Sequence, residues 1–389
     1  MIPELRQRFN AEFTPEKYQT FLDLVEAGCG MPPPFRHCET PCFYPLELMT
    51  KMADYGREML VSLIGDASYL AEAAQTVPDA YRVAQPDTKP LFAQVDFGLT
   101  ADGEPHLVEI QGFPSLYGYQ PFLAQCYQEA YGLDPDLKTL LGGLDTAGYV
   151  QSLRTAIIGD HDPANVVLLE IDPYEQKTLP DFVMTERICG LKIVSLMDVR
   201  QVGKRLFYPD GDRLVPIERI YNRVIVDELT RKNMTPPFDF RADLDVEWAG
   251  HPDWYFKISK YSLPYLKHVS VPHTVFLDRL ATLPNDLDNY VLKPLFSFAG
   301  LGVRIGPTRD EIEAITDRSQ YILQERMDFA PLIETPHGPT KAEIRMMYLW
   351  QEDEPIALTS LVRMGRGKML GVDQNRDAEW VGGSAGFMR

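Results

Sequence analysis

The feature that most constrains the fold is a β-α-β pattern in the middle of the chain. Residues 165–171 form a short apolar run whose first apolar residues are valines, which is typical of a strand buried on both faces. Residues 181–189 are helical in pattern and end at Gly190, a common helix terminator. Residues 191–196 are again strand-like. A helix between two buried strands predicts a small parallel sheet, which residues 217–226 would extend.

Helical and hairpin patterns flank this sheet. Residues 45–77 carry apolar side chains at helical spacing, which predicts an amphipathic helix pair in a mainly helical stretch. Residues 93–99 and 106–110 alternate around a loop that contains Asp102-Gly103, which predicts a β-hairpin. We also expect helices within 119–158 and strands at 290–293, 303–305, 322–325 and 343–349. The chain is therefore expected to have an α/β (α+β) fold.

Charge and composition exclude several classes of protein. The 389 residues include 38 Lys and Arg against 56 Asp and Glu, a net charge of −18, and such an acidic surface repels a nucleic-acid backbone. No apolar run approaches the roughly 18 residues that cross a bilayer, and the N-terminal residues lack the layout of a signal peptide. Five cysteines are too few for a disulfide scaffold. We expect a cytoplasmic protein with small-molecule partners and leave a homodimer open.

One face of the predicted hairpin gathers oxygen ligands. Glu109 and Gln111 are two residues apart on one strand, so their side chains leave the same face, and Asp96 lies on the paired strand. Carboxylate and amide oxygens suit a hard cation such as Mg²⁺. The alternative is a solvated hairpin face, and spacing alone leaves both interpretations open.

A glycine-containing loop lies between two predicted strands. Lys293 ends the first strand, and Ser297, Gly300 and Gly302 lie in the loop. Backbone N–H groups of such loops approach phosphate oxygens, and a lysine adds positive charge. The pattern lacks the helix and Gly-Lys-Ser/Thr sequence of a P-loop, and a plain turn is the alternative. Lys260, on a predicted short helix upstream, is either a phosphate ligand or part of a solvated face.

The C-terminal segment combines positive charge with glycine. Arg363, Arg366 and Lys368 stand within six residues, and a glycine-rich stretch that includes Gly383 follows. Three cations and a flexible stretch suit a clamp for a carboxylate or an acyl phosphate. The alternative is a basic turn followed by a frayed tail.

Cys38 and Cys42 stand close to His37 and Cys29 in the sequence. Such a set can bind zinc or undergo redox chemistry. No second pair of Cys or His stands at ligand spacing, so we favour structural burial. Arg36, beside them, is a candidate for binding an anionic substrate.

The order of these elements resembles the ATP-grasp superfamily. The residues that carry the resemblance are, in chain order, Lys260, Pro272, Lys293-Pro294 with its glycine loop, Leu323-Gln324-Glu325 and Glu343-Ile-Arg345. The hairpin acids are spaced as in that family, and Glu109-Ile-Gln111 stands where its members have Glu-x-Asn. The hairpin comes about 180 residues before Lys293 rather than last. This order, and the ending with Leu361-Val-Arg363 and 382–386, resembles the circularly permuted branch that includes eukaryotic-type glutathione synthetases and glutathionylspermidine synthetases.

The resemblance implies a circularly permuted ATP-grasp fold with four regions. These are a mainly helical N-terminal region (1–90), a metal-binding hairpin with the helices after it (91–160), a Rossmann-like substrate domain (161–235) and the nucleotide-binding subdomains (236–389).

The resemblance also implies a role for each candidate residue. ATP would be bound by Lys260, Lys293, Ser297, Gly300, Gly302, Gln324, Glu325 and Met327. Mg²⁺ would be held by Asp96, Glu109 and Gln111. Arg363 and Lys293 would be catalytic, and the substrate would contact Arg223, Arg363, Arg366, Lys368 and Gly383.

Two functions follow. The favoured one is an ATP-dependent carboxylate–amine ligase, which joins two small molecules by an amide or peptide bond through an acyl phosphate. The alternative is a non-catalytic nucleotide-binding module with a degenerate site. It is motivated by Gln94, Gln111 and Ser297, which stand where relatives carry Arg, Asn and a metal-binding Glu. Retention of Asp96 and Glu109 favours the ligase.

Overall fold

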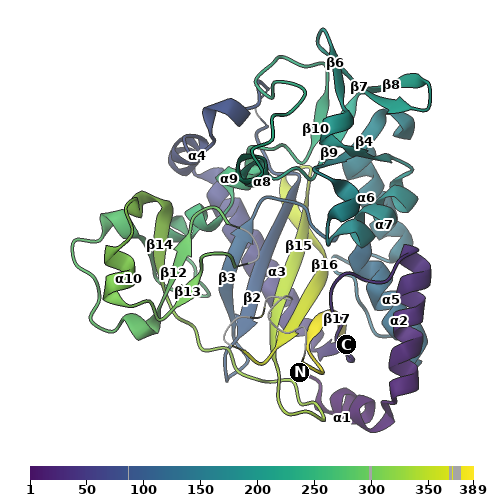
Figure 1. Ribbon diagram of the computed structural model, residues 1–389. Helices are drawn as coiled ribbons and strands as arrows, with labels where there is room; N and C mark the ends of the chain where they lie inside the picture. Colours follow the sequence, from purple (N-terminus) through teal and green to yellow (C-terminus); the bar gives the residue numbers. More distant parts are fainter. Residues whose placement is uncertain (86, 298–299, 368–369, 371–377) are drawn as a thin grey trace.

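The computed structural model describes residues 1–85, 87–297, 300–367, 370 and 378–389. Over these residues the chain has a mixed α/β fold with four sheets (Figure 1). A six-stranded sheet forms the centre, a parallel sheet with its helices lies to one side of it, and a smaller antiparallel sheet lies to the other. Within the described part of the chain, no helix has both the length and the apolar character that crossing a membrane requires.

The central sheet joins segments from both ends of the chain. Its strand order is β1-β17-β16-β15-β2-β3, and every neighbouring pair is antiparallel except β1 with β17. The strands are β1 (Cys42–Tyr44), β2 (Phe92–Leu99), β3 (Pro105–Gln111), β15 (Lys341–Gln351), β16 (Glu354–Gly365) and β17 (Gly382–Met388). The predicted hairpin is confirmed as β2 and β3, and Gly103 has a positive φ of 81° in its turn.

The two faces of this sheet differ in chemistry, because successive side chains of a strand point to opposite sides. On one face, Val95, Ile344 and Val362 are buried with the apolar side of α3 (Leu46–Gly65). With α4 (Ala67–Ala74), that helix confirms the predicted amphipathic pair. The opposite face carries Asp96 and Arg345 in the middle of their strands, and this face forms the floor of the site described below.

The predicted parallel sheet is confirmed. Its strand order is β10-β9-β4-β5, and its strands are β4 (Val166–Glu170), β5 (Lys192–Ser195), β9 (Arg219–Asn222) and β10 (Glu247–Ala249). Side chains of α6 (Thr146–Ile158) and α7 (Leu179–Cys189) share a buried core with this sheet. As predicted, α7 ends at Gly190, which has a left-handed φ of 74°.

The predicted strand at 217–226 is too long. Ile217 ends β8 in a separate sheet, and α8 (Val226–Arg231) begins where the strand was expected to end. The strand itself ends at Asn222, whose side-chain oxygen accepts a hydrogen bond from the N–H of Val224 at 3.3 Å. Such a local turn competes with strand pairing, and the apolar pattern of the sequence does not reveal it.

Two antiparallel sheets complete the described strands. One has the order β11-β14-β12-β13, and the other has the order β6-β7-β8. Their strands are β6 (Arg200–Val202), β7 (Arg205–Asp210), β8 (Arg213–Ile217), β11 (Thr274–Phe276), β12 (Tyr290–Pro294), β13 (Arg304–Ile305) and β14 (Tyr321–Glu325). The strands predicted at 290–293, 303–305 and 322–325 are therefore confirmed. Figure 1 shows α10 (Arg309–Glu313) beside β12 and β14.

The remaining helices lie in the N-terminal stretch and within 119–158, as predicted, and just before Lys260. They are α1 (Pro3–Glu12), α2 (Pro15–Cys29), α5 (Tyr119–Tyr131) and α9 (Trp254–Lys257). The short helix predicted to carry Lys260 does not include it. The helix α9 ends at Lys257, and Lys260 begins a separate 3₁₀ segment capped by the Ser259 side chain.

The interpretation of the C-terminal glycines as a flexible or frayed tail is wrong. They form β17, which is hydrogen-bonded on both sides. Gly382 has φ of 122°, and a Cβ there would lie 2.5 Å from the carbonyl oxygen of Arg36. The N–H of Gly383 donates to that carbonyl at 2.9 Å, and the N–H of Cys38 donates to Gly383 at 2.8 Å. The glycines therefore permit a close approach of the N-terminal segment.

Candidate functional site

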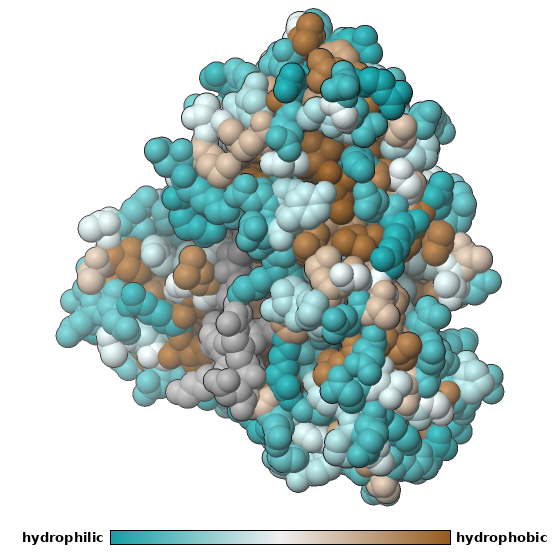
Figure 2. All heavy atoms as spheres, turned by 45° about the vertical axis from the view of Figure 1, so that its right-hand side comes forward, coloured by the Kyte–Doolittle hydropathy of each residue, from teal (hydrophilic) through white to brown (hydrophobic). Residues whose placement is uncertain are grey.

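A cleft of about 1400 Å³ is lined by residues from three of the sheets. The central sheet contributes β3 and β16, the parallel sheet contributes the end of β4, and the smaller antiparallel sheet contributes β12 and β14. Figure 2 shows a mainly hydrophilic outer surface with apolar side chains gathered toward the middle of the visible face. Pockets for one drug-sized molecule measure about 300–1,000 Å³, so the cleft has room for more than one ligand.

The floor of the cleft carries a compact group of charges. We call it the floor cluster, and it consists of Asp96, Glu109, Glu343, Arg345 and Arg363. Arg345 donates from Nε and Nη2 to the two oxygens of Asp96, at 2.6 and 2.7 Å. Arg363 donates from Nη2 to both Asp96 and Glu343. Asp96 is fully buried, and because both of its oxygens are bonded to guanidinium groups, neither is free to bind a cation in this arrangement.

Two glutamines extend the floor cluster. Gln94 accepts a hydrogen bond from Nη1 of Arg345 at 3.0 Å and donates to the carbonyl of Ser115 at 2.7 Å. The amide of Gln111 lies 2.8 Å from that of Gln94. With its oxygen turned toward the guanidinium, Gln111 accepts hydrogen bonds from Arg345 at 2.9 Å. Glu109 also lines the cleft, but it lies 3.6 Å from Arg345. Of the three predicted metal ligands, it is therefore the one that arginine holds least closely.

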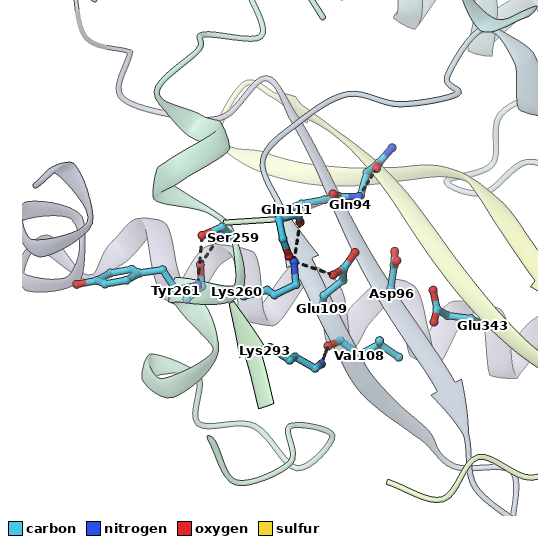
Figure 3. A network of polar contacts seen from close by, with 12 residues as sticks. Gln94, Asp96, Val108, Glu109, Gln111, Ser259, Lys260, Tyr261, Lys293 and Glu343 are labelled. Atoms are coloured by element: carbon cyan, nitrogen blue, oxygen red, sulfur yellow. Dashed lines mark hydrogen bonds and ion pairs between the residues drawn. The ribbon is translucent and has the colours of Figure 1, made fainter. Parts of the chain in front are cut away.

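Two lysines face the floor cluster from the opposite side of the cleft (Figure 3). Lys260 Nζ donates to the carbonyl of Ser297 at 2.9 Å and lies 3.5 Å from Oε2 of Glu109. Lys293 Nζ donates to the carbonyl of Val108 at 2.8 Å. Both ammonium groups keep further N–H donors, since each carries three. The predicted solvated face for Lys260 does not hold, because its side chain is buried.

Burial and neighbouring charges shift the pKa values of these groups. Burial raises the pKa of Asp96, but Arg345 and Arg363 outweigh that effect and hold it below its ordinary value. Burial raises the pKa of Glu343, and the charges of Asp96 and Glu109 add to the rise. Burial lowers the pKa of Lys293 to about 8, although Glu109 opposes the change. An anion that binds beside Lys293 would stabilise its protonated form.

The predicted ATP-binding residues of the antiparallel sheet line the same cleft. Gln324 and Glu325 lie at the end of β14, and Met327 follows. Ser297 and Gly300 also line the cleft, and Oγ of Ser297 is buried with no hydrogen-bond partner among the described residues. Gly302 is beside this wall rather than in it, and a Cβ there would lie 2.8 Å from the Pro294 ring.

Arg223 lines the cleft but already has a carboxylate partner. Its Nη1 donates to Asp181 of α7 at 2.9 Å, and both side chains are almost fully buried. Asp181 also accepts hydrogen bonds from the backbone N–H groups of Leu116, Gly118 and Tyr119. No sequence pattern singled out this carboxylate, which holds the loop before α5 in place even though Leu116 has an unfavourable φ of 65°.

Glu170 is a second site residue that the sequence analysis missed. It lies at the carboxyl end of β4, between β9 and β5, where the strand order of the parallel sheet reverses. Ligands of open parallel sheets bind at such positions, and Glu170 lines the cleft. Burial raises its pKa to about 8, although the charge of Arg223 opposes the rise. The sequence signal that could have identified Glu170 is an acidic residue at the end of an apolar run.

The other candidates lie outside the cleft or outside the described residues. Arg366 is exposed, donates to the carbonyl of Glu379 at 2.7 Å and does not line the cleft. Lys368 lies outside the described residues. Arg36 is paired with Glu39. All five cysteines are buried and free, as expected for structural residues.

Comparisons with known proteins do not assign a function to this cleft. Comparison of the sequence with models of protein families and with curated proteins finds no match. Within the described ranges, no group of three or more His, Cys, Asp or Glu side chains is arranged to hold a metal ion. The function is therefore inferred from the cleft itself.

Proposed function

We propose that the chain is an ATP-dependent carboxylate–amine ligase with a circularly permuted ATP-grasp fold. The observation that carries the proposal is the meeting of two lysines, a carboxylate-bearing hairpin and an arginine-bearing strand in one cleft. These parts come from residues more than 250 positions apart in sequence, from Glu109 to Arg363. The parallel sheet beside the cleft would be the Rossmann-like domain that receives the second substrate.

The residues present fit a nucleotide triphosphate. Lys260 and Lys293 supply positive charge with unused N–H donors, and Ser297 supplies a buried hydroxyl without a partner among the described residues. Gln324 and Met327, at and after the end of β14, form a wall for the base. An anion between the lysines would also replace the solvation that Lys293 has lost.

The fit to Mg²⁺ rests on two carboxylates rather than on the three predicted ligands. Glu109 and Glu343 line the cleft, and Glu343 is bonded to Arg363 through Oε1 alone. Both oxygens of Asp96, in contrast, are bonded to Arg345 or Arg363. Mg²⁺ is often held by one or two carboxylates together with phosphate oxygens and water. When bound, the ion would supply charge neutralisation for the transferring phosphoryl group.

The side chains of the chain itself explain how an amide bond would form. A carboxylate is a poor acyl donor, and transfer of the terminal phosphoryl group of ATP converts it to an acyl phosphate. Attack of an amine on the acyl carbon then forms the C–N bond and expels phosphate. Arg363, held between Asp96 and Glu343, would bind the carboxylate and stabilise the oxyanion of the tetrahedral intermediate. Lys293 would neutralise charge on the transferring group.

One observation favours the alternative, a nucleotide-binding module without turnover. In the floor cluster, Asp96 and Glu343 already neutralise Arg345 and Arg363, which lowers the affinity of those arginines for a substrate. The two functions differ in one result. The ligase releases ADP only when acid and amine are present, whereas the module binds nucleotide and releases none.

Glu109→Gln tests the proposal, because it removes one cation-binding charge but keeps the shape of the side chain. We expect Mg²⁺-dependent ADP formation to fall at least about 100-fold, a loss of roughly 3 kcal/mol of transition-state stabilisation. Glu104→Gln is the matched control, since Glu104 lies on the same hairpin, pairs with Lys51 and does not line the cleft. Full turnover in Glu109→Gln with an unchanged unfolding midpoint would contradict the proposal.

A further inference from the structure

The cleft has an apolar end next to Arg363. We call it the apolar end, and it consists of Phe35, Leu116, Tyr119, Leu123 and Leu361. These side chains come from the N-terminal segment, the loop before α5, α5 itself and β16. Phe35 and Leu116 pack against the buried core that contains Tyr119 and Leu123, and Leu116 also packs against the core that contains Leu361. The apolar end is therefore a fixed wall, continuous with the interior of the protein.

The strand register places this wall beside the candidate carboxylate ligand. Leu361 and Arg363 are two residues apart on β16, so both side chains leave the same face of the sheet. Gly383 of β17 lies directly opposite Arg363 and contributes no side chain, which leaves space over the sheet at this point. Phe35 bounds that space, because a Cβ at Gly383 would lie 3.6 Å from its ring.

The polar atoms at this end are bonded within the protein. The hydroxyl of Tyr119 lies 2.6 Å from Nε2 of His37. The amide nitrogen of Gln120 donates to the carbonyl of Ser384 at 2.9 Å, and the hydroxyl of Ser384 donates to Thr40 at 2.8 Å. A ligand at this end therefore meets ring faces and methyl groups rather than unpaired donors.

The electrostatics of this end agree with its composition. Burial lowers the pKa of His37 to about 3, so the imidazole behind Tyr119 is neutral at physiological pH. Arg36, next to Phe35 in sequence, is neutralised by Glu39. Arg345 lies opposite Leu361 on β15, but its Nε, Nη1 and Nη2 atoms all donate to Asp96 or Gln94. Arg363 is 21% exposed, and its hydrogen bonds to other described residues use Nη2 alone. An arginine that keeps Nε and Nη1 available beside an apolar wall matches a molecule with one carboxylate and an apolar body.

We propose that the carboxylate substrate of this cleft is a monocarboxylic acid with an aromatic or branched aliphatic body. Its carboxylate contacts Arg363, and its body lies over Gly383 against Phe35, Leu361 and Tyr119. This assignment rests on the proposed function, because it takes Arg363 as the group that binds the acid. It excludes short dicarboxylic acids, whose second charge would lose its hydration against the apolar wall.

Gly383 offers a graded way to test the size of this site. Its φ is not in the left-handed region, and a Cβ would stand at ordinary contact distance from Phe35 and from the Arg36 carbonyl. Gly383→Ala is therefore expected to fold normally and to narrow the site slightly, and Gly383→Val is expected to narrow it further. Gly65→Val is the matched control, since Gly65 is exposed, has no atom within 4 Å of a Cβ and does not line the cleft.

The test compares 3-phenylpropanoate with glutarate, two acids of similar length and opposite polarity. Calorimetric titration without nucleotide measures binding of each acid. A second assay adds Mg–ATP and hydroxylamine, which attacks an acyl phosphate to give a hydroxamate and phosphate, so that no natural amine is needed. We expect 3-phenylpropanoate to bind at least about 10-fold more tightly than glutarate, and Gly383→Val to weaken it by about 10-fold. The affinity for glutarate should change by less than about 3-fold in Gly383→Val, and the affinity for 3-phenylpropanoate should change by less than about 3-fold in Gly65→Val.

The outcomes separate this inference from the proposed function. Equal or tighter binding of glutarate, or equal weakening of both acids by Gly383→Val, overturns the apolar site. If hydroxamate forms from glutarate in that case, the ligase proposal stands alone. If 3-phenylpropanoate binds as expected but no hydroxamate forms from any acid, the apolar site stands and the ligase proposal falls. Gly383→Ala, compared by thermal unfolding, gives the same comparison should the valine variant fold poorly.

Discussion

Two buried acids, Asp96 in the central sheet and Glu170 in the parallel sheet, differ in how their environments treat charge. Exposure is 0% for Asp96 and 4% for Glu170, yet the pKa of Asp96 lies below its ordinary value and the pKa of Glu170 rises to about 8. Burial favours the neutral acid in both cases. The difference is that Asp96 has two guanidinium partners, whereas Arg223 near Glu170 is paired with Asp181.

The sheets themselves explain this contrast. In the antiparallel sheet, Arg345 lies directly opposite Asp96 on the neighbouring strand, so cross-strand pairing delivers the partner. In the parallel sheet, Glu170 is the last residue of β4 and faces the cleft. In the floor cluster, the register between the strands therefore determines which residue pairs with Asp96. At the end of β4, a charged partner for Glu170 has to come from a loop or from a ligand.

The largest expected effect comes from breaking the floor cluster. Asp96→Asn leaves the buried Arg345 and the partly buried Arg363 with less compensation, and we expect a loss of about 3–5 kcal/mol in the free energy of unfolding at pH 7. The carboxylate contributes stability above its unfolded pKa of 3.8, and this contribution disappears as the pH falls through the lower folded value. The difference between the variant and wild type should therefore shrink in acid. Urea unfolding at several pH values measures it, and a loss below about 1 kcal/mol at pH 7 would refute the role of the cluster.

Glu170→Gln is expected to act in the opposite direction. Because the folded pKa of about 8 lies above the ordinary value of 4.5, the unfolded chain ionises first as the pH rises, which destabilises the wild type between pH 4.5 and 8. The glutamine does not ionise, so its advantage should grow by at most about 1.4 kcal/mol per pH unit across this range. Unfolding midpoints of both proteins from pH 4 to 9 test this. A constant difference would show that folding does not shift the pKa of Glu170.

Lys293 extends the comparison to a buried cation. Lys293→Met should weaken nucleotide binding by about 10- to 100-fold, since it removes a buried positive charge from the proposed phosphate site. Wild-type affinity should fall as the pH rises above about 8, where the free lysine loses its proton, and the variant should lack this dependence. Lys257→Met is the control, because Lys257 pairs with Asp253 and does not line the cleft. Equal affinities for Lys293→Met and wild type at pH 7 would argue against a phosphate contact.

The smallest effect concerns a neutral pair. Tyr119→Phe removes the hydroxyl that lies 2.6 Å from His37 Nε2, and Nδ1 of His37 has no partner among the described residues. We expect a loss of about 1–2 kcal/mol in unfolding free energy with little change across pH 5 to 8, because His37 stays neutral over this range. Chemical unfolding at pH 5 and pH 8 provides the check. A loss that differs strongly between the two pH values would mean that His37 titrates.

The sequence was sufficient for elements whose signal is local. The valine-rich run of β4, the glycine that ends α7 and the alternation of β2 and β3 each predicted their structure. The sequence was misleading where contacts with a distant segment determine the local structure. The glycines at 382 and 383 resemble a flexible tail, but the backbone at Arg36 and Cys38 pairs with them to make a buried strand.

The candidate site follows the same division. The resemblance in sequence order grouped Glu109, Lys260 and Lys293 into one site, and the structure places all three in one cleft. It did not show that Arg345 would hold Asp96, because that pairing depends on the register between β2 and β15. Nor did it single out Asp181, which acts through backbone groups of a loop far from it in sequence.

The central claim is that this cleft couples ATP to the joining of an acid and an amine. The most direct test is mass spectrometry of the purified protein after incubation with Mg–ATP and a pool of carboxylic acids, amino acids and amines. The account predicts ADP together with a new compound whose mass equals that of one acid plus one amine minus one water. Bound nucleotide without ADP release in every pool would contradict the account and leave a nucleotide-binding module.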